Sequence, residues 1–180
     1  MDQQGQSPLF PKGKLHCGAM IVEAIARIYK LPYEPSRWGD FCGIIERFVV
    51  ATGGMLPGTM LKILHVMGVE PELVSVKEEN RFDFLRNVFV MRKTVILLVA
   101  MGPGHWVWVR EQARRHDGMC LYDPSVKNKA EIVPTPQSGN RLMTMGNTLG
   151  WWYTTFFMRN IARVKGKHLA IVLNKPEPTG

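Results

Sequence analysis

The chain has 180 residues, of which 46% are hydrophobic, so its size and composition fit one globular domain with a sizeable core. Its 23 basic and 15 acidic side chains give a formal net charge of +8. We expect no transmembrane segment, because no run of about twenty apolar residues is present, and no secretory signal, because the first residues are polar.

The start of the chain has the apolar periodicity of helices. Residues 1–14 are rich in Gln, Gly, Pro and Lys, and we predict a flexible segment there. From Gly18 to Tyr29, apolar side chains recur on one broad face, which predicts a buried helix that starts at Cys17. Pro32 marks a break, and a second helix is predicted over Phe41 to Val50.

Two further helices and a short strand are predicted next. Thr59 is placed to cap a helix over Met60 to Met67, which Gly68 closes. Glu72 to Val76 is predicted to be a short strand. Phe82 to Met91 is predicted to be a helix, because its apolar residues again fall on one face.

From Thr94 onward the pattern changes to short strands. Thr94 to Ala100 is almost purely apolar, Gly102 to Gly104 is a turn, and His105 to Glu111 is the predicted returning strand. Met119 to Tyr122 is a third predicted strand, which ends directly before Asp123. These elements predict an α+β fold, with N-terminal helices packed on a C-terminal antiparallel β-sheet.

The last part of the chain shows no internal repeat and no second domain boundary. Strands are predicted over Ile132 to Thr135, over the aromatic stretch Trp151 to Met158, and over Leu169 to Leu173. Gly139 to Gly150 is predicted to be a loop. We therefore interpret residues 126–180 as a basic and aromatic extension of the same sheet.

Positive charge is concentrated in this last part. From Lys127 onward there are only two acidic residues, Glu131 and Glu177, against eight basic ones: Lys127, Lys129, Arg141, Arg159, Arg163, Lys165, Lys167 and Lys175. Such a segment favours an acidic partner, although a solvated basic face would have the same composition. The aromatic residues beside it fit either a stacking platform for single-stranded nucleic acid or buried sheet packing, of which we favour the packing.

Cys17 stands where a thiol can be activated. A helix N-terminus offers free backbone N–H groups and partial positive charge, and both favour the thiolate form of a cysteine. Cys17 opens the first predicted helix. We predict that it is a nucleophile held by a rigid, packed element.

His105 and Asp123 supply the partners that such a nucleophile needs. His105 follows a turn at the mouth of a predicted strand, where an imidazole can border a cleft. Asp123 precedes Pro124 at the end of the next strand, where its carboxylate can bond the far ring nitrogen and set the tautomer. The chain order Cys17, His105, Asp123 predicts a catalytic triad.

This arrangement resembles the papain-like peptidases that cut double-glycine leader peptides from bacteriocin precursors, and their stand-alone relatives. The matching pieces are Cys17-Gly18-Ala19, the apolar strand before His105, His105-Trp106-Val107 and Asp123-Pro124, with 88 residues (105 − 17) from the cysteine to the histidine. The resemblance covers residues 15–125. It implies a catalytic core over 15–125 and a thiolate–imidazolium pair oriented by the aspartate. Because the tail shows no domain boundary, we expect a single papain-like domain over residues 15–180, in which 126–180 extends the sheet.

The chain departs from the family pattern before the cysteine. The family usually carries a glutamine six residues before the cysteine, whose amide helps to form the oxyanion hole, but Pro11 stands there. The residue before the cysteine is often acidic in the family, and here it is His16. Either another donor completes the hole, such as the Cys17 backbone N–H with a side chain from the first fifteen residues, or the activity is altered.

The three cysteines point to a reducing environment. Cys17, Cys42 and Cys120 cannot all pair, and none lies in a CxxC spacing, so we expect no structural zinc. Cys42 and Cys120 are interpreted as small buried apolar residues. No metal or other cofactor is expected, since four histidines lack regular ligand spacing, namely His16, His65, His116 and His168.

The sequence thus predicts a cysteine hydrolase that acts on an amide of a peptide or protein. A peptidase, a glutamine deamidase and an acyl transferase can all use the same triad. A small basic hydrolase fits a cytoplasmic protein, or a bacterial effector or toxin domain delivered by a route without a signal peptide. Two alternatives stay open, namely a catalytically inactive papain-like binding module, and a nucleic-acid-binding protein that uses the basic C-terminal segment.

Overall fold

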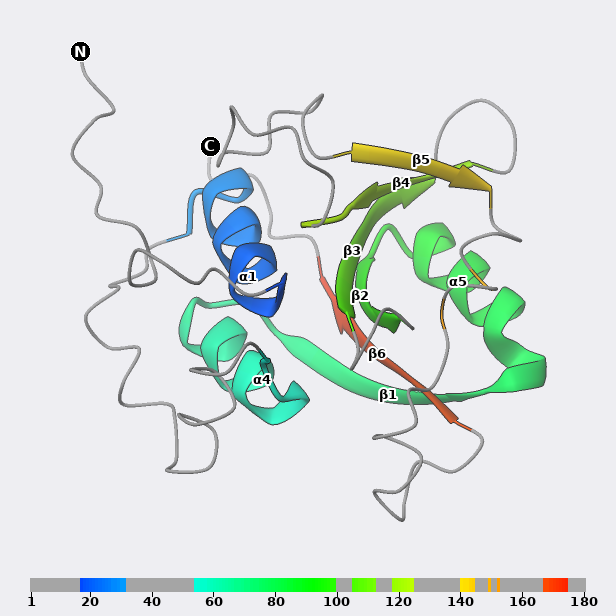
Figure 1. Ribbon diagram of the computed structural model, residues 1–180, viewed down its shortest axis with the longest axis horizontal. Coiled ribbons are helices and arrows are strands. Elements are labelled where there is room, and N and C mark those ends of the chain that lie inside the picture. The colour runs from blue at the N-terminus through cyan, green and yellow to red at the C-terminus, as the bar shows by residue number, and fades with distance from the viewer. Residues whose placement is uncertain are drawn as a thin grey trace.

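The computed structural model describes residues 17–31, 54–99, 105–112, 118–124, 140–144, 149, 152 and 167–174. These ranges contain three α-helices, one short 3-10 helix and six strands (Figure 1). In chain order they are α1 (Cys17–Ile28), α4 (Pro57–Val66), β1 (Pro71–Lys77), η2 (Glu78–Asn80), α5 (Arg81–Val90), β2 (Thr94–Val99), β3 (His105–Gln112), β4 (Gly118–Tyr122), β5 (Asn140–Thr144) and β6 (Lys167–Leu173).

The six strands form one sheet in the order β1-β6-β2-β3-β4-β5, and every neighbouring pair is antiparallel. The strands β2, β3 and β4 follow one another in the chain and pair as two consecutive hairpins. The last strand, β6, lies inside the sheet, between β1 and β2. The predicted α+β class and the antiparallel sheet are confirmed.

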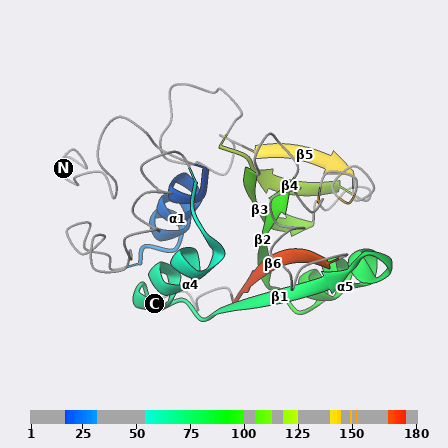
Figure 2. The same cartoon turned by 60° about the horizontal axis from the view of Figure 1, so that its bottom comes forward.

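Helices cover both faces of this sheet. The helices α1 and α4 pack on one face, whereas α5 packs on the other (Figures 1 and 2). The strand β3 shows how the two cores arise, because Trp106 and Trp108 join the α1 side and Val107 and Val109 join the α5 side. A strand covered on both faces needs apolar side chains at every position, which explains the uninterrupted apolar run of β2. The sheet is therefore enclosed between α1 and α4 on one face and α5 on the other.

Most predicted elements are present within a few residues of their predicted ends. The helix from Cys17, the strand over 72–76, the helix over 82–91 and the three strands from Thr94 are all confirmed. The helix predicted over 60–67 begins earlier, because Pro57 occupies its first turn and Leu56 is its N-cap. Thr59 is therefore not the cap, and it lies buried inside the helix. Gly68 closes the helix as predicted, with a left-handed φ of 80°.

The last part of the chain differs most from the prediction. The segment predicted as a loop over 139–150 contains β5, which pairs with β4 at the sheet edge. Trp152 lies outside any strand, and the rest of the strand predicted over 151–158 falls outside the described ranges. The predicted strand over 169–173 is confirmed as β6, although it joins the sheet between two other strands and does not extend an edge.

Other predictions fall outside the described ranges. They concern the flexible segment 1–14, the helix over 41–50, the strand over 132–135 and most of the basic segment. Within the ranges that the structure describes, no helix combines the length and the apolar character needed to cross a bilayer.

Candidate active site

His105 and Asp123 meet at one end of the sheet. His105 is the first residue of β3 and Asp123 follows the last residue of β4, and these strands are antiparallel, so both residues lie at the same end. The Nε2 atom of His105 lies 2.8 Å from Oδ1 of Asp123. Both side chains are buried, with 9% of His105 and 1% of Asp123 exposed. The pairing of β3 with β4 therefore holds the imidazole and the carboxylate in contact.

Cys17 approaches the same imidazole from the helical side. It is the first residue of α1, which packs on the sheet against Trp106 and Trp108. Its thiol is half-buried, and the side chain of His105 lies close enough to lower the pKa of Cys17. The backbone N–H of Trp106 donates a hydrogen bond to Sγ, with 3.5 Å between the two atoms. The three predicted site residues are thus brought together in the order Cys17, His105, Asp123.

The surroundings of the thiol favour its ionised form. Burial raises the pKa of Cys17, but hydrogen bonds from the His105 side chain and the Trp106 backbone, the charge of His105 and a bond from the Gly18 backbone outweigh it. The pKa of Cys17 therefore lies below its ordinary value of 9.0. A thiolate is the nucleophilic form of cysteine, so these contacts favour the form of Sγ that can act as a nucleophile.

The surroundings of His105 favour its protonated form. Burial lowers the pKa of His105, whereas hydrogen bonds to Asp123 and Cys17, together with the negative charges of both, raise it to about 9. The carboxylate occupies Nε2, which leaves Nδ1 as the nitrogen that serves the thiol. Over the pH range between the pKa of Cys17 and about 9, the pair exists as thiolate and imidazolium.

Sequence reasoning missed two buried groups beside this pair. Glu23 lies on α1 with 2% of its surface exposed and forms an ion pair with Arg27, and Tyr122 directly precedes Asp123. Burial and the negative charges of Glu23 and Asp123 raise the pKa of Tyr122 to about 12. The phenol therefore stays neutral at any pH at which the site would work. The i, i+4 spacing of the Glu23–Arg27 pair was the only signal in the sequence, and it did not indicate burial.

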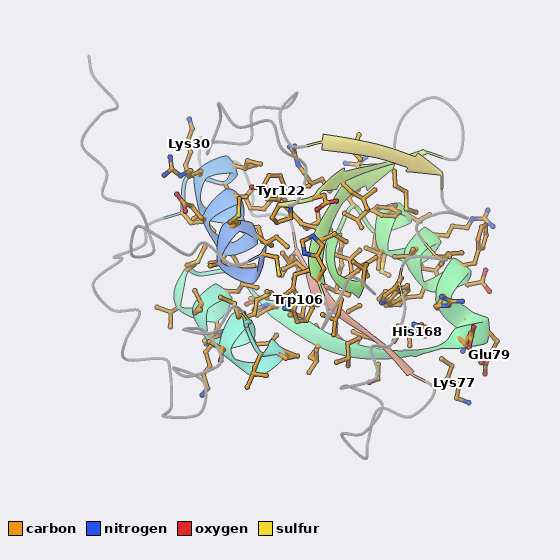
Figure 3. The ribbon with its side chains drawn as sticks, in the orientation of Figure 1. Lys30, Lys77, Glu79, Trp106, Tyr122 and His168 are labelled. Atoms are coloured by element: carbon orange, nitrogen blue, oxygen red, sulfur yellow. The ribbon has the colours of Figure 1, made fainter. Side chains whose placement is uncertain are left out.

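Trp106 was also missed as part of the site. Because side chains alternate along a strand, Trp106 lies on the face of β3 opposite His105, where it packs between α1 and the sheet (Figure 3). Its backbone N–H nevertheless reaches Sγ of Cys17. No sequence pattern indicates a contact that is made by a backbone atom of the residue after the histidine.

The other candidate residues have structural or undescribed positions. His65 is exposed on α4, and His168 is 3% exposed on the α5 side, where its ring packs against Trp152 (Figure 3). Cys120 lies on β4 and is half-buried, so it is less buried than the sequence suggested. Cys42, Pro11, His16 and the first fifteen residues lie outside the described ranges, and with them the predicted second donor to the oxyanion hole. Across the ranges that the structure describes, no group of three or more His, Cys, Asp or Glu residues could hold a metal ion.

Comparisons with known proteins add a distant structural likeness. No family model matches this chain, and no curated protein matches it. Among solved structures, the chain is similar to a double glycine motif protease from an AMS/PCAT transporter in complex with the leader peptide. The two share 13% sequence identity with a TM-score of 0.41, over 92% of this chain and 89% of the other. At such values the chemistry has to be judged from the geometry of the site itself.

Proposed function

We propose that the protein is a papain-like cysteine hydrolase that acts on an amide of a peptide or protein. The observation that supports this most is the line of contacts from the half-buried thiol of Cys17, through the imidazole of His105, to the buried carboxylate of Asp123. The three residues lie at the start of α1, at the start of β3 and directly after β4. A cysteine whose only role was to fill the core would not need a histidine and a carboxylate aligned behind its sulfur.

The proposed reaction has two stages. In the first, the Cys17 thiolate attacks the amide carbonyl carbon, and a carbon–sulfur bond forms while the carbonyl oxygen takes up the negative charge. The His105 imidazolium then gives its proton to the amide nitrogen, the carbon–nitrogen bond breaks, and the amine leaves. The products of this stage are a free amine and a thioester between Cys17 and the acyl part of the substrate.

In the second stage water replaces the thiolate. His105, now neutral, takes a proton from water as its oxygen attacks the thioester carbon, and the carbon–sulfur bond then breaks. A carboxylic acid leaves, and the thiolate–imidazolium pair is restored. Asp123 holds the imidazole in one tautomer and stabilises its positive charge in both stages.

The same steps serve several substrates. If the leaving amine is the rest of a peptide chain, the reaction is proteolysis, and if it is ammonia from a glutamine side chain, the reaction is deamidation. Attack by an acceptor other than water makes the reaction an acyl transfer. Activity as a delivered bacterial effector or toxin domain, and an acidic partner for the basic C-terminal segment, stay predictions from the sequence.

The test is the rate at which iodoacetamide alkylates Cys17 as a function of pH, followed by mass spectrometry in the wild type and in His105→Ala. We expect the wild-type thiol to react with an apparent pKa well below 9.0, and the variant to lose this behaviour. Cys120, on β4 and outside the line of contacts, gives an internal reference in the same digests. Acylation by 4-nitrophenyl acetate, with Cys17→Ser as the control, then measures whether the thioester forms and hydrolyses.

The alternative reading makes the opposite prediction. If the chain is an inactive binding module with this fold, Cys17 reacts like an ordinary or shielded thiol, and His105→Ala leaves its profile unchanged. That result would overturn the proposed function.

A further inference from the structure

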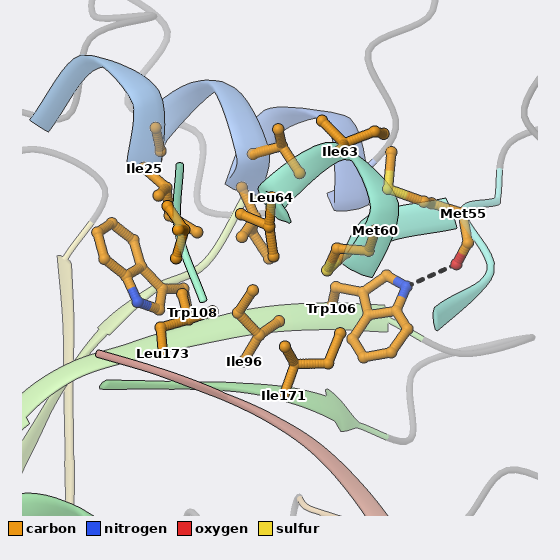
Figure 4. Close-up of a cluster of buried hydrophobic side chains, with 14 of the residues drawn as sticks. Ile25, Met55, Met60, Ile63, Leu64, Ile96, Trp106, Trp108, Ile171 and Leu173 are labelled. Atoms are coloured by element: carbon orange, nitrogen blue, oxygen red, sulfur yellow. Dashed lines mark hydrogen bonds between the residues drawn. The ribbon is translucent and has the colours of Figure 1, made fainter. Parts of the chain in front are cut away.

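Trp106 makes two hydrogen bonds that link β3 to the start of α1 and to the segment before α4. Its backbone N–H donates to Sγ of Cys17, as described above. Its indole Nε1–H donates to the backbone carbonyl oxygen of Met55, at 2.9 Å (Figure 4). Trp106 is 3% exposed and Met55 is 5% exposed, so both hydrogen bonds lie in the interior. A buried indole N–H without a partner would be costly, and this partner is the carbonyl of the residue just before the N-cap of α4.

Met55 in turn lies against the start of α1. A Cβ atom added to Gly18 would stand 2.7 Å from the Cβ of Met55, closer than real Cβ atoms approach one another. Only glycine therefore allows this contact, and it sits directly after Cys17. The position of the first turn of α1 is set by a backbone segment that Trp106 holds by its indole.

These contacts form a closed bracket. It runs from the indole of Trp106 to the Met55 carbonyl, from the Met55 side chain to Gly18, and from Cys17 back to the Trp106 backbone N–H. His105 is the chain neighbour of Trp106, so the same bracket fixes the distance between the thiol and the imidazole. A displacement of Met55 would move Cys17 while leaving His105 on its strand.

We infer that Trp106 is a positioning residue, whose indole N–H holds Cys17 at His105 through Met55 and Gly18. This inference rests on the proposed function. Trp106 need not touch the substrate, since it acts through the placement of the sulfur. Small changes in the placement of a reacting atom have large effects on rate.

Trp108 offers a matched control. It lies two residues further along β3, on the same face and in the same hydrophobic cluster as Trp106, and is fully buried. Its indole N–H, unlike that of Trp106, has no hydrogen-bond partner among the residues that the structure describes. Replacing either tryptophan by phenylalanine removes a similar volume from the same core, but within the described ranges only Trp106→Phe removes a hydrogen bond.

The experiment compares Trp106→Phe with Trp108→Phe by the rate and the pH profile of Cys17 alkylation. We expect Trp106→Phe to slow alkylation at pH 6.5 by about threefold to tenfold, the range for one lost buried hydrogen bond, and to move the profile to higher pH. Trp108→Phe should leave the profile in place. The midpoint temperature of thermal unfolding should fall in both variants, since both lose core volume.

A second variant tests the hydrogen bond without changing the packing of the ring, in case Trp106→Phe folds poorly. Incorporation of 3-benzothienylalanine at position 106 replaces the indole N–H by sulfur and keeps the shape of the ring, so it removes the hydrogen bond alone. The inference is wrong if this variant reacts like the wild type, or if both phenylalanine variants shift the profile equally. A wild-type Cys17 that is unreactive and indifferent to His105→Ala would instead overturn the proposed function itself.

Discussion

Asp123→Asn separates the charge of the carboxylate from its shape. Asparagine has nearly the same volume and keeps an oxygen that can accept the hydrogen bond from His105, but it carries no negative charge. Asp123 is 1% exposed and its Oδ1 lies 2.8 Å from Nε2 of His105, so its charge acts at short range with little screening by solvent. The substitution should therefore destabilise the imidazolium without opening a cavity.

The size of the effect follows from the pKa of His105. The gap between about 9 and the ordinary 6.5 corresponds to about 3 kcal/mol in favour of the charged ring, at about 1.4 kcal/mol per pKa unit. Burial opposes this shift, and Asp123 and Cys17 together produce it, with the hydrogen bond to Asp123 as the larger favourable contribution. If about half of the gap comes from Asp123, the variant should lower the pKa of His105 by about 1 and raise that of Cys17.

The sign for stability follows from the same shift. A raised folded-state pKa contributes stability that is fully present below pH 6.5 and is lost as the pH rises toward 9. The free energy of unfolding should therefore differ most between wild type and Asp123→Asn near pH 6. The difference should shrink above pH 9, where the imidazole is neutral in both proteins.

The assay is an NMR titration with ¹³C-labelled histidine, in which His105→Gln identifies the signal of His105 among the five histidines. We expect a midpoint near pH 9 in the wild type and about 1 lower in Asp123→Asn, with a parallel shift of the Cys17 alkylation profile to higher pH. Urea unfolding at pH 6 and pH 9.5 measures the stability difference. A wild-type midpoint near 6.5, or one that the substitution does not move, would refute the reasoning.

Two further predictions concern the stability of the fold, the first at the start of α1 beside Cys17 and the second at the start of α5. Gly18→Ala should lower stability by about 1–3 kcal/mol and slow Cys17 alkylation, because the new Cβ has no room, whereas Gly58→Ala in α4 meets nothing within 4 Å and should be neutral or slightly stabilising. Urea unfolding of both variants checks this, and equal losses would contradict it. Arg81 donates from Nη1 to two backbone carbonyls, among them that of Trp152 at 2.9 Å, so Arg81→Lys should cost about 1.5–3 kcal/mol, while the exposed Arg86→Lys should cost almost nothing. Intrinsic fluorescence during urea unfolding reports it, and an Arg81→Lys midpoint equal to that of Arg86→Lys would show that these bonds contribute nothing.

The proximity of Cys17, His105 and Asp123 could be predicted because each of them lies at an element boundary that the sequence marks. Cys17 opens an apolar helix, His105 follows a turn rich in glycine and proline, and Asp123 precedes a proline. Local chemistry decides where helices and strands start and end, so it also decided where these side chains lie along their elements. Contact among the three then needed only an antiparallel pairing of consecutive strands and a helix packed on their end.

The parts that could not be predicted depend on contacts between distant residues. The bond from Trp106 to the Met55 carbonyl spans 51 positions, and no local pattern connects the two residues. The strand β5 was missed because its sequence, NRLMT, shows no alternation of apolar and polar residues and owes its conformation to pairing with β4. Thr59 is of a residue type that often caps helices, but Pro57 in the first turn makes the helix start earlier in the chain than predicted.

The place of β6 links the end of the chain to the site, although no site residue belongs to it. Leu173 pairs with Pro71 of β1 and with Thr94 of β2, so β6 bridges two strands that otherwise would not meet. Its side chains Ala170 to Leu173 lie in both cores, and burial of each large apolar one contributes about 1.5–3 kcal/mol. The strand β2, which β6 supports, pairs through Val99 with His105 itself. The imidazole is therefore held in place by a sheet in which β6 joins β1 to β2, so the geometry of the pair depends on contacts made more than forty residues beyond Asp123.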